Sequence, residues 1–201
     1  AKVKRLPLPA RFGPEYLTYV LWAVSPEGRP ANLGELVLNA GNGGRLKTSC
    51  ELQSFALLVT AEPYFAVTQP SDVVVMENII RRDTVGKVEP VVARAELLPR
   101  GHYTYLRSSV GSKESGFGDK LSMDQYESML ALYQALNAIR IARSAGADQG
   151  AAETMRRAEA LYEEARRLQS EKAESRQVVM AARQAAQTAA DARAIQAKRA
   201  Q

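Results

Sequence analysis

The sequence contains few of the residues on which most metalloproteins and disulfide-stabilised domains depend. Its 201 residues include one Cys, one His and one Trp. The single thiol, Cys50, excludes an intrachain disulfide and any zinc site built from cysteines. With no His or cationic cluster nearby to activate it, we expect a buried, inert thiol rather than a redox centre or nucleophile. His102 has no second His or matching Cys, so we predict no metal site and interpret it as a surface or hydrogen-bonded polar residue.

Long hydrophobic runs are also missing. The longest, residues 17–24 and 55–59, fall far short of the roughly 20 residues that span a bilayer. No charged-then-apolar signal segment opens the chain. The protein is therefore either cytosolic or separated from a leader that has been removed, and we expect any membrane anchor to lie in flanking segments outside this chain.

Basic residues are interleaved with acidic ones almost everywhere in the sequence, so charge of one sign is not concentrated. The net charge is +5, but basic and acidic residues alternate, as in residues 156–159 and 163–167. This spacing brings opposite charges together on a helix surface and is typical of a solvated face. A nucleic-acid-binding protein would show a one-sided basic stripe with aromatic residues or a recognised module. We therefore predict no nucleic-acid partner.

Glycine and proline punctuate only the first part of the chain. After Gly150 neither residue occurs, and the composition changes near Ser108 from β-branched to rich in Ala, Arg and Glu. Residues 107–121 form a Gly/Ser-rich stretch typical of a flexible linker. The expected fold is α+β, with a β-sandwich domain at residues 1–106, the linker at 107–121, and an Ala-rich helical segment at 122–201.

Short apolar runs bounded by turn residues predict the strands. Residues 16–24 are followed by a Pro/Gly turn at 25–30, which favours a hairpin. Further strands are expected at residues 33–38, 46–52, 55–60, 73–80 and 88–98, with a register change at 53–54. About seven strands without helical crossovers favour an antiparallel immunoglobulin-like sandwich. Residues 16–24 and 73–80 are apolar at odd and even positions alike, which point to opposite faces of a sheet. We therefore expect both strands to be covered on both faces.

Helical periodicity predicts about three helices in the second half. Ser122 and Gln125 have capping-box spacing, Gly146 is suited to end the first helix, and the third is expected to begin near Ser175. The expected core stripes are Met129, Leu132, Tyr133, Leu136 and Ile139 in the first helix; Met155, Ala158, Tyr162, Ala165 and Leu168 in the second; and Val178, Ala182, Ala185, Ala189 and Ala192 in the third.

Two groups of aromatic residues are candidate ligand sites. Tyr126, Tyr133 and Tyr162 could surround a cofactor, although core packing is the favoured interpretation and no cofactor is predicted. Tyr64, Phe65 and Tyr105 could form a carbohydrate-binding platform, although loop aromatics more often pack locally. No nucleophile-elbow or metal spacing is visible, so we predict neither an enzyme nor catalytic residues, and the binding residues stay undefined.

Residues 19–63 carry a resemblance to a known family. A Tyr-x-x-Trp strand at residues 19–22, a glycine-containing turn at 26–30, a Leu-Gly strand at 33–36 and a Val-Thr-x-Glu-Pro edge at 59–63 resemble the extracytoplasmic β-sandwich of anti-sigma-K factors. The likeness covers about residues 16–70. It departs after Pro63, where residues 64–71 replace the family's Gly-rich ending. The chain also lacks the family's membrane helix and sigma-binding helices, so the resemblance does not imply anti-sigma activity.

The whole chain resembles exported acidobacterial-type proteins. In these, such a sandwich precedes an Ala-rich helical region and an outer-membrane protein A type peptidoglycan-binding domain, which is not in this chain. Residues 137–148 and 158–165 are similar to a helical family of envelope lipoproteins. The resemblance implies a non-enzymatic scaffold or interaction module, periplasmic or outer-membrane associated, with a protein or cell-wall partner and a homo-oligomer as an open possibility. The alternatives are a regulatory sensor related to anti-sigma factors and a carbohydrate-binding module.

Overall fold

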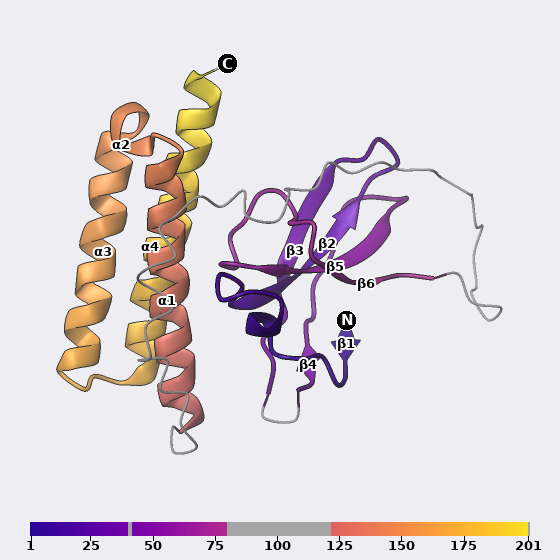
Figure 1. The fold of residues 1–201 in the computed structure, drawn as a ribbon, viewed down its shortest axis with the longest axis horizontal. Helices are drawn as coiled ribbons and strands as arrows, with labels where there is room; N and C mark the ends of the chain where they lie inside the picture. The colour runs from indigo at the N-terminus through magenta and orange to yellow at the C-terminus, as the bar shows by residue number, and fades with distance from the viewer. Residues whose placement is uncertain (40–41, 80–121, 201) are drawn as a thin grey trace. The chain divides into compact units, whose positions relative to one another are not determined.

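The structure is a computed structural model that describes residues 1–39, 42–79 and 122–200. The chain divides into two compact units, residues 1–102 and residues 103–201. Antiparallel strands make up the first and helices the second (Figure 1), which confirms the predicted α+β class. The predicted linker at 107–121 and the predicted strand at 88–98 lie outside the described residues.

Two antiparallel sheets organise the described residues of the first unit. A two-stranded sheet pairs β1 (Lys2–Val3) with β4 (Gly44–Arg45). A four-stranded sheet has the order β3-β2-β5-β6, from β3 (Pro30–Glu35), β2 (Thr18–Val24), β5 (Ala56–Glu62) and β6 (Val74–Glu77). A 3-10 helix, Pro9–Arg11, joins β1 to β2. The predicted hairpin is confirmed as β2 and β3, where Ser25 and Gly28 close the turn through the Gly28 amide and the Ser25 carbonyl.

The central strand β2 is buried along its whole length, as its composition predicts. On one face, Tyr19 and Leu21 lie opposite Ala61 and Val59 of β5 and belong to an apolar core. That core also takes residues from the N-terminal segment and from the chain after β3: Val3, Leu6, Tyr16, Leu36 and Val73. Trp22 points to the other face and is also fully buried. Burial on both faces explains why the sequence of β2 does not alternate.

The prediction of coverage on both faces is wrong for β6. Val74 and Met76 are exposed to 40% and 42%, and Glu77 is exposed as well. The topology explains the error, because β6 lies at the edge of the sheet and pairs only with β5 among the described strands. The register shift between Val59 and Thr60 shortens this pairing further.

The predicted strand at residues 46–52 is also absent. Only Gly44 and Arg45 of this region are in a strand, paired with Val3 and Lys2. In this antiparallel register, residues after Leu46 extend past β1 and meet no partner strand among the described residues. A strand needs such a partner for its backbone hydrogen bonds, which an apolar pattern alone cannot supply. The predicted register change at 53–54 coincides with a bend before β5.

Within residues 122–200, the second unit is a bundle of three long helices with one short helical turn. The helices are α1 (Met123–Ser144), α2 (Ala147–Gly150), α3 (Ala152–Ser170) and α4 (Ser175–Arg199). The capping box is confirmed, since the Gln125 amide donates to Ser122 Oγ at 3.2 Å and the Ser122 amide donates to Gln125 Oε1 at 3.0 Å. Gly146 ends α1 with a left-handed φ of +80°. No helix in the described part of the chain is long and apolar enough to cross a membrane.

Alanine dominates the interior of this bundle. The predicted α4 stripe is fully confirmed, with Val178, Ala182, Ala185, Ala189 and Ala192 all buried. The α1 stripe is only partly correct. Ile139 is buried, but the larger residues Met129, Leu132, Tyr133 and Leu136 are half-buried, while Ala131, Ala135 and Ala138 occupy the centre. The small face of α4 admits small side chains of α1 and leaves the larger ones at the margin of the contact.

Candidate functional site

A pocket of about 560 Å³ lies beside the two-stranded sheet of the first unit. Both strands and the loop that precedes β4 contribute to it. Its described lining residues are Lys2, Val3, Lys4, Arg5, Asn39, Gly43, Gly44 and Arg45. Four of these eight residues are cationic, and none of the described lining residues is acidic.

The alternation of β1 places the charges at the surface. Val3 is buried in the core, whereas Lys2 and Lys4 on either side of it are exposed. Lys2 lies directly opposite Arg45 in the antiparallel register, so both side chains leave the same face of the sheet. Arg5 follows with φ +58°, a left-handed conformation that turns the chain and lets the Leu6 amide donate to the Asn42 carbonyl at 3.0 Å.

A hydrogen-bonded loop forms the opposite wall. The Asn39 amide donates to the Gly43 carbonyl at 2.8 Å, and the Gly43 amide donates to Asn39 Oδ1 at 3.1 Å. Asn42 has φ +55° and donates from its amide to the Asn39 carbonyl. A side chain at Gly44 would place its Cβ 3.0 Å from the Val37 carbonyl oxygen, so the backbone approaches too closely for a larger residue. Hydrogen bonds that involve the backbone of Asn39, Asn42 and Gly43 therefore fix the shape of this wall.

The positive charge of this pocket is not neutralised by any acidic residue in its described lining. Like charges directly opposite one another on a sheet destabilise the pairing, and Lys2 faces Arg45 in this way. Across the part of the chain that the structure describes, none of the four cationic side chains makes a hydrogen bond or ion pair. The arrangement is suited to attract an anion, because four positive charges converge without an acidic neighbour to neutralise them.

A second polar cluster lies in the interior of the four-stranded sheet. Trp22 Nε1 donates to Thr60 Oγ1 at 2.8 Å, and Thr60 Oγ1 donates to Glu62 Oε1 at 2.5 Å. The Ser71 amide also donates to Glu62 Oε1, at 2.7 Å. Trp22, Thr60 and Glu62 are all fully buried, so the carboxylate is closed to solvent and substrate. These hydrogen bonds satisfy groups that would otherwise be costly to bury, which is a structural role.

Those residues singled out from the sequence that the structure describes do not form a site. Cys50 is half-buried rather than buried, and it lies in the irregular segment after β4. Tyr64 has 1% of its surface exposed, so at this position the favoured interpretation, local packing, holds and the ring is not available to a carbohydrate-binding platform. Phe65 is half-buried, and its carbonyl accepts from Asn32 Nδ2 at 2.9 Å. His102 and Tyr105 lie outside the described residues.

The three tyrosines of the helical unit lie at the edge of its packed interior. Tyr126, Tyr133 and Tyr162 are half-buried on α1 and α3. Burial raises the pKa of Tyr126 and that of Tyr162, which is typical of phenols held in packed surroundings. Within residues 1–39, 42–79 and 122–200 no group of three His, Cys, Asp or Glu residues is placed to hold a metal ion.

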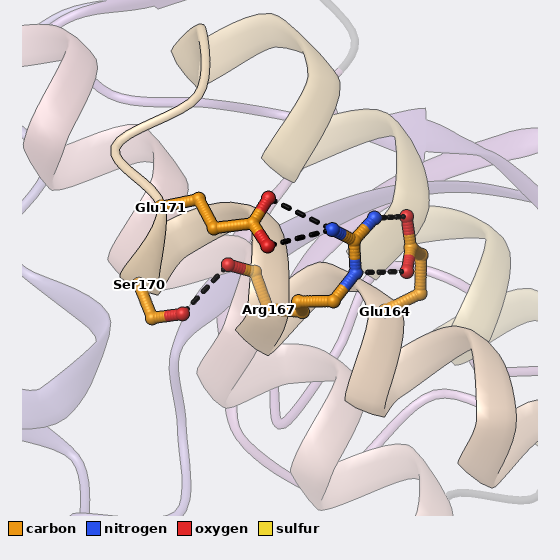
Figure 2. Close-up of polar contacts among 4 residues, drawn as sticks. All are labelled: Glu164, Arg167, Ser170 and Glu171. Carbon is orange, nitrogen blue, oxygen red and sulfur yellow. Dashed lines mark hydrogen bonds and ion pairs between the residues drawn. The ribbon is translucent and has the colours of Figure 1, made fainter.

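Ion pairs cover the outer face of α3, as the alternating charges predict. Figure 2 shows Arg167 between Glu164 and Glu171, with Nη2 2.7 Å from Glu164 Oε1 and Nη1 2.7 Å from Glu171 Oε1. The hydrogen bond from Arg167 lowers the pKa of Glu164. All three side chains are exposed, so the pairs contribute little to the free energy of folding and leave the face solvated.

Sequence reasoning missed the basic pocket because its parts are about 40 residues apart in the chain. One signal was present, since no acidic residue precedes Glu15 while Lys2, Lys4 and Arg5 fall within the first five positions. The contribution of Arg45 and of the loop depends on the β1–β4 register, which two paired residues cannot reveal in a sequence. No protein-family model, no curated protein and no solved structure matches the chain.

Proposed function

We propose that the protein is a non-enzymatic interaction module of the cell envelope, exported to the periplasm or outer membrane, in which the β unit binds an anionic envelope component. The observation that carries this proposal is the pocket with four cationic side chains and no acidic residue in its described lining. Its cations are exposed and therefore accessible to a large partner. A binding function needs no nucleophile or general base, in keeping with the closed position of Glu62.

The helical unit fits the role of a spacer. α4 has 25 residues and extends for roughly 37 Å at about 1.5 Å per residue. Its buried alanines pack against α1 and α3, and the outer face of α3 carries solvated ion pairs. The sequence resemblance to exported proteins supports an immunoglobulin-like sandwich and a precursor that continues into a peptidoglycan-binding domain. The immunoglobulin-like sandwich and the peptidoglycan-binding domain of the precursor are both parts of this proposal.

The alternatives receive less support. The carbohydrate-binding module depended on an exposed aromatic platform, and Tyr64 is buried. The regulatory sensor rests on the resemblance of residues 19–63 alone. We therefore favour the envelope module over both.

Fractionation and binding together test this function. The full-length precursor, tagged in its native host, is expected in the periplasmic or outer-membrane fraction. The purified chain is expected to sediment with isolated envelopes, and the Lys2→Glu/Arg45→Glu variant to sediment less. A precursor found in the cytosol, or a chain that stays in the supernatant with envelopes, would contradict the proposal.

A further inference from the structure

We infer that the basic pocket recognises phosphate groups, and that its ligand carries at least two of them or one joined to a larger body. This inference rests on the proposed function in that it names the chemistry of the same pocket. The observations behind it are the charge balance of the pocket, its size, and the kinds of side chain that line it.

Charge balance favours phosphate over a single carboxylate. Lys2, Lys4, Arg5 and Arg45 supply four positive charges, with no acid in the described lining. A carboxylate would neutralise one of them, whereas a phosphate monoester carries about −1.5 to −2 at pH 7. Two phosphate groups would therefore come close to balancing the pocket. They would also relieve the repulsion between Lys2 and Arg45, which face one another across the sheet.

The donor set is also suited to phosphate. The two arginines can each present a planar fork to two phosphate oxygens, and the two lysines act as mobile point charges. The pocket, of about 560 Å³, has room for a ligand larger than a single inorganic ion.

The lining argues against a nucleic acid. Proteins that bind single strands place aromatic side chains on which the bases stack. The described lining contains no aromatic residue, and Val3 is its only large apolar side chain. Recognition through the anionic group alone fits either a phospholipid headgroup at a membrane surface or a soluble polyphosphate, and the experiment separates these two sources.

The experiment uses the full chain, labelled with ¹⁵N, in low salt. One arm titrates inorganic pyrophosphate and follows backbone amide shifts. A second arm measures sedimentation with phosphatidylcholine vesicles that contain or lack phosphatidic acid. Citrate, a carboxylate polyanion, is the comparison ligand. We expect saturable shifts at Lys2, Gly43, Gly44 and Arg45 with pyrophosphate, and weaker ones with citrate. Vesicle binding that requires phosphatidic acid would identify the lipid headgroup as the source, and pyrophosphate binding without it would identify a soluble ligand.

Matched variants test whether the pocket itself is responsible. Lys2→Glu/Arg45→Glu is expected to weaken pyrophosphate binding at least about tenfold, equivalent to about 1.4 kcal/mol. The control, Arg11→Glu/Arg29→Glu, changes the net charge equally at exposed residues that do not line the pocket. It is expected to change affinity less than about twofold, since distant exposed charges are screened. Unchanged amide spectra outside the substituted positions confirm that each variant folds.

Several results would overturn the inference. They are the absence of saturable binding to either phosphate probe, equal weakening in the control variant, citrate binding as tight as pyrophosphate, or tighter binding of a single-stranded oligonucleotide. The outcome is separable from that of the proposed function. If the pocket variant loses envelope binding but the unsubstituted chain binds pyrophosphate no more tightly than citrate, the envelope module stands and the ligand assignment fails. If the pocket binds pyrophosphate but the precursor is cytosolic, the ligand assignment stands and the envelope module fails.

Discussion

Replacement of Thr60 by Val tests whether the buried polar cluster stabilises the β unit. The two side chains have nearly the same shape, so the change removes one hydroxyl and leaves the packing of β5 intact. That hydroxyl accepts from Trp22 Nε1 at 2.8 Å and donates to Glu62 Oε1 at 2.5 Å. Both partners are fully buried, so water cannot replace the lost hydrogen bonds.

The size of the effect follows from those two bonds. A buried donor left unpaired costs about 1–3 kcal/mol, and a hydrogen bond to a charged group contributes about 1.5–3 kcal/mol. Glu62 retains the amide of Ser71 at 2.7 Å, so the two costs do not add in full. We expect the free energy of unfolding of the β unit to fall by about 3 kcal/mol. With an m value of about 1.5 kcal/mol/M, the urea midpoint falls by about 2 M.

Trp22 provides the assay, because it is the only tryptophan in the chain and it is fully buried in β2. Its fluorescence in urea reports on the β unit alone. Thr68→Val is the matched control, since Thr68 is exposed and the same hydroxyl is lost there. The control is expected to unfold within about 0.5 kcal/mol of the unsubstituted chain. If Thr60→Val also unfolds within that margin, the cluster does not stabilise the unit and the reasoning is wrong.

Three further predictions follow from the same structure. Ala185→Leu should destabilise the helical unit by about 1–3 kcal/mol through overpacking, as measured by circular dichroism at 222 nm, whereas Leu at the exposed Ala194 of α4 should not. Burial raises the pKa of Tyr19 from 10.0 to about 12. Its neutral form is therefore favoured by folding, so its stabilising contribution is complete below pH 10 and is lost as the pH rises through about 12. The Tyr19→Phe variant, followed by Trp22 fluorescence, should lack that part of the alkaline loss, and an identical pH profile would contradict the assignment. Residues 1–106 expressed alone should melt cooperatively, and an aggregating product would count against this domain boundary.

Local signals explain why the helices were well predicted. A capping box, such as that of Ser122 and Gln125, acts within one turn of helix, and Gly146 ends α1 through its own backbone conformation. Neither depends on the rest of the fold. The face of α1 could not be predicted in the same way, because the alanines of α4 decide whether Leu132 or Ala135 reaches the centre of the contact.

The strands and the pocket depended on pairing between distant segments. The composition of β2 correctly predicted a strand buried on both faces, since such burial selects apolar residues at both odd and even positions. The same pattern in β6 was misleading, because an edge strand can expose Val74 and Met76. The basic pocket requires the register that places Lys2 opposite Arg45. No feature of either segment specifies that register by itself, so the candidate site could not be found from the sequence.

The buried alanine face of α4 has a consequence for how the ancestry of such chains is judged. Ala182, Ala185, Ala186, Ala189 and Ala192 have no exposed surface, so substitution by any larger residue would force the helices apart. Selection for this spacing alone would retain alanine there, in unrelated bundles as well as related ones. An Ala-rich helical region therefore records the distance between helices more than common descent.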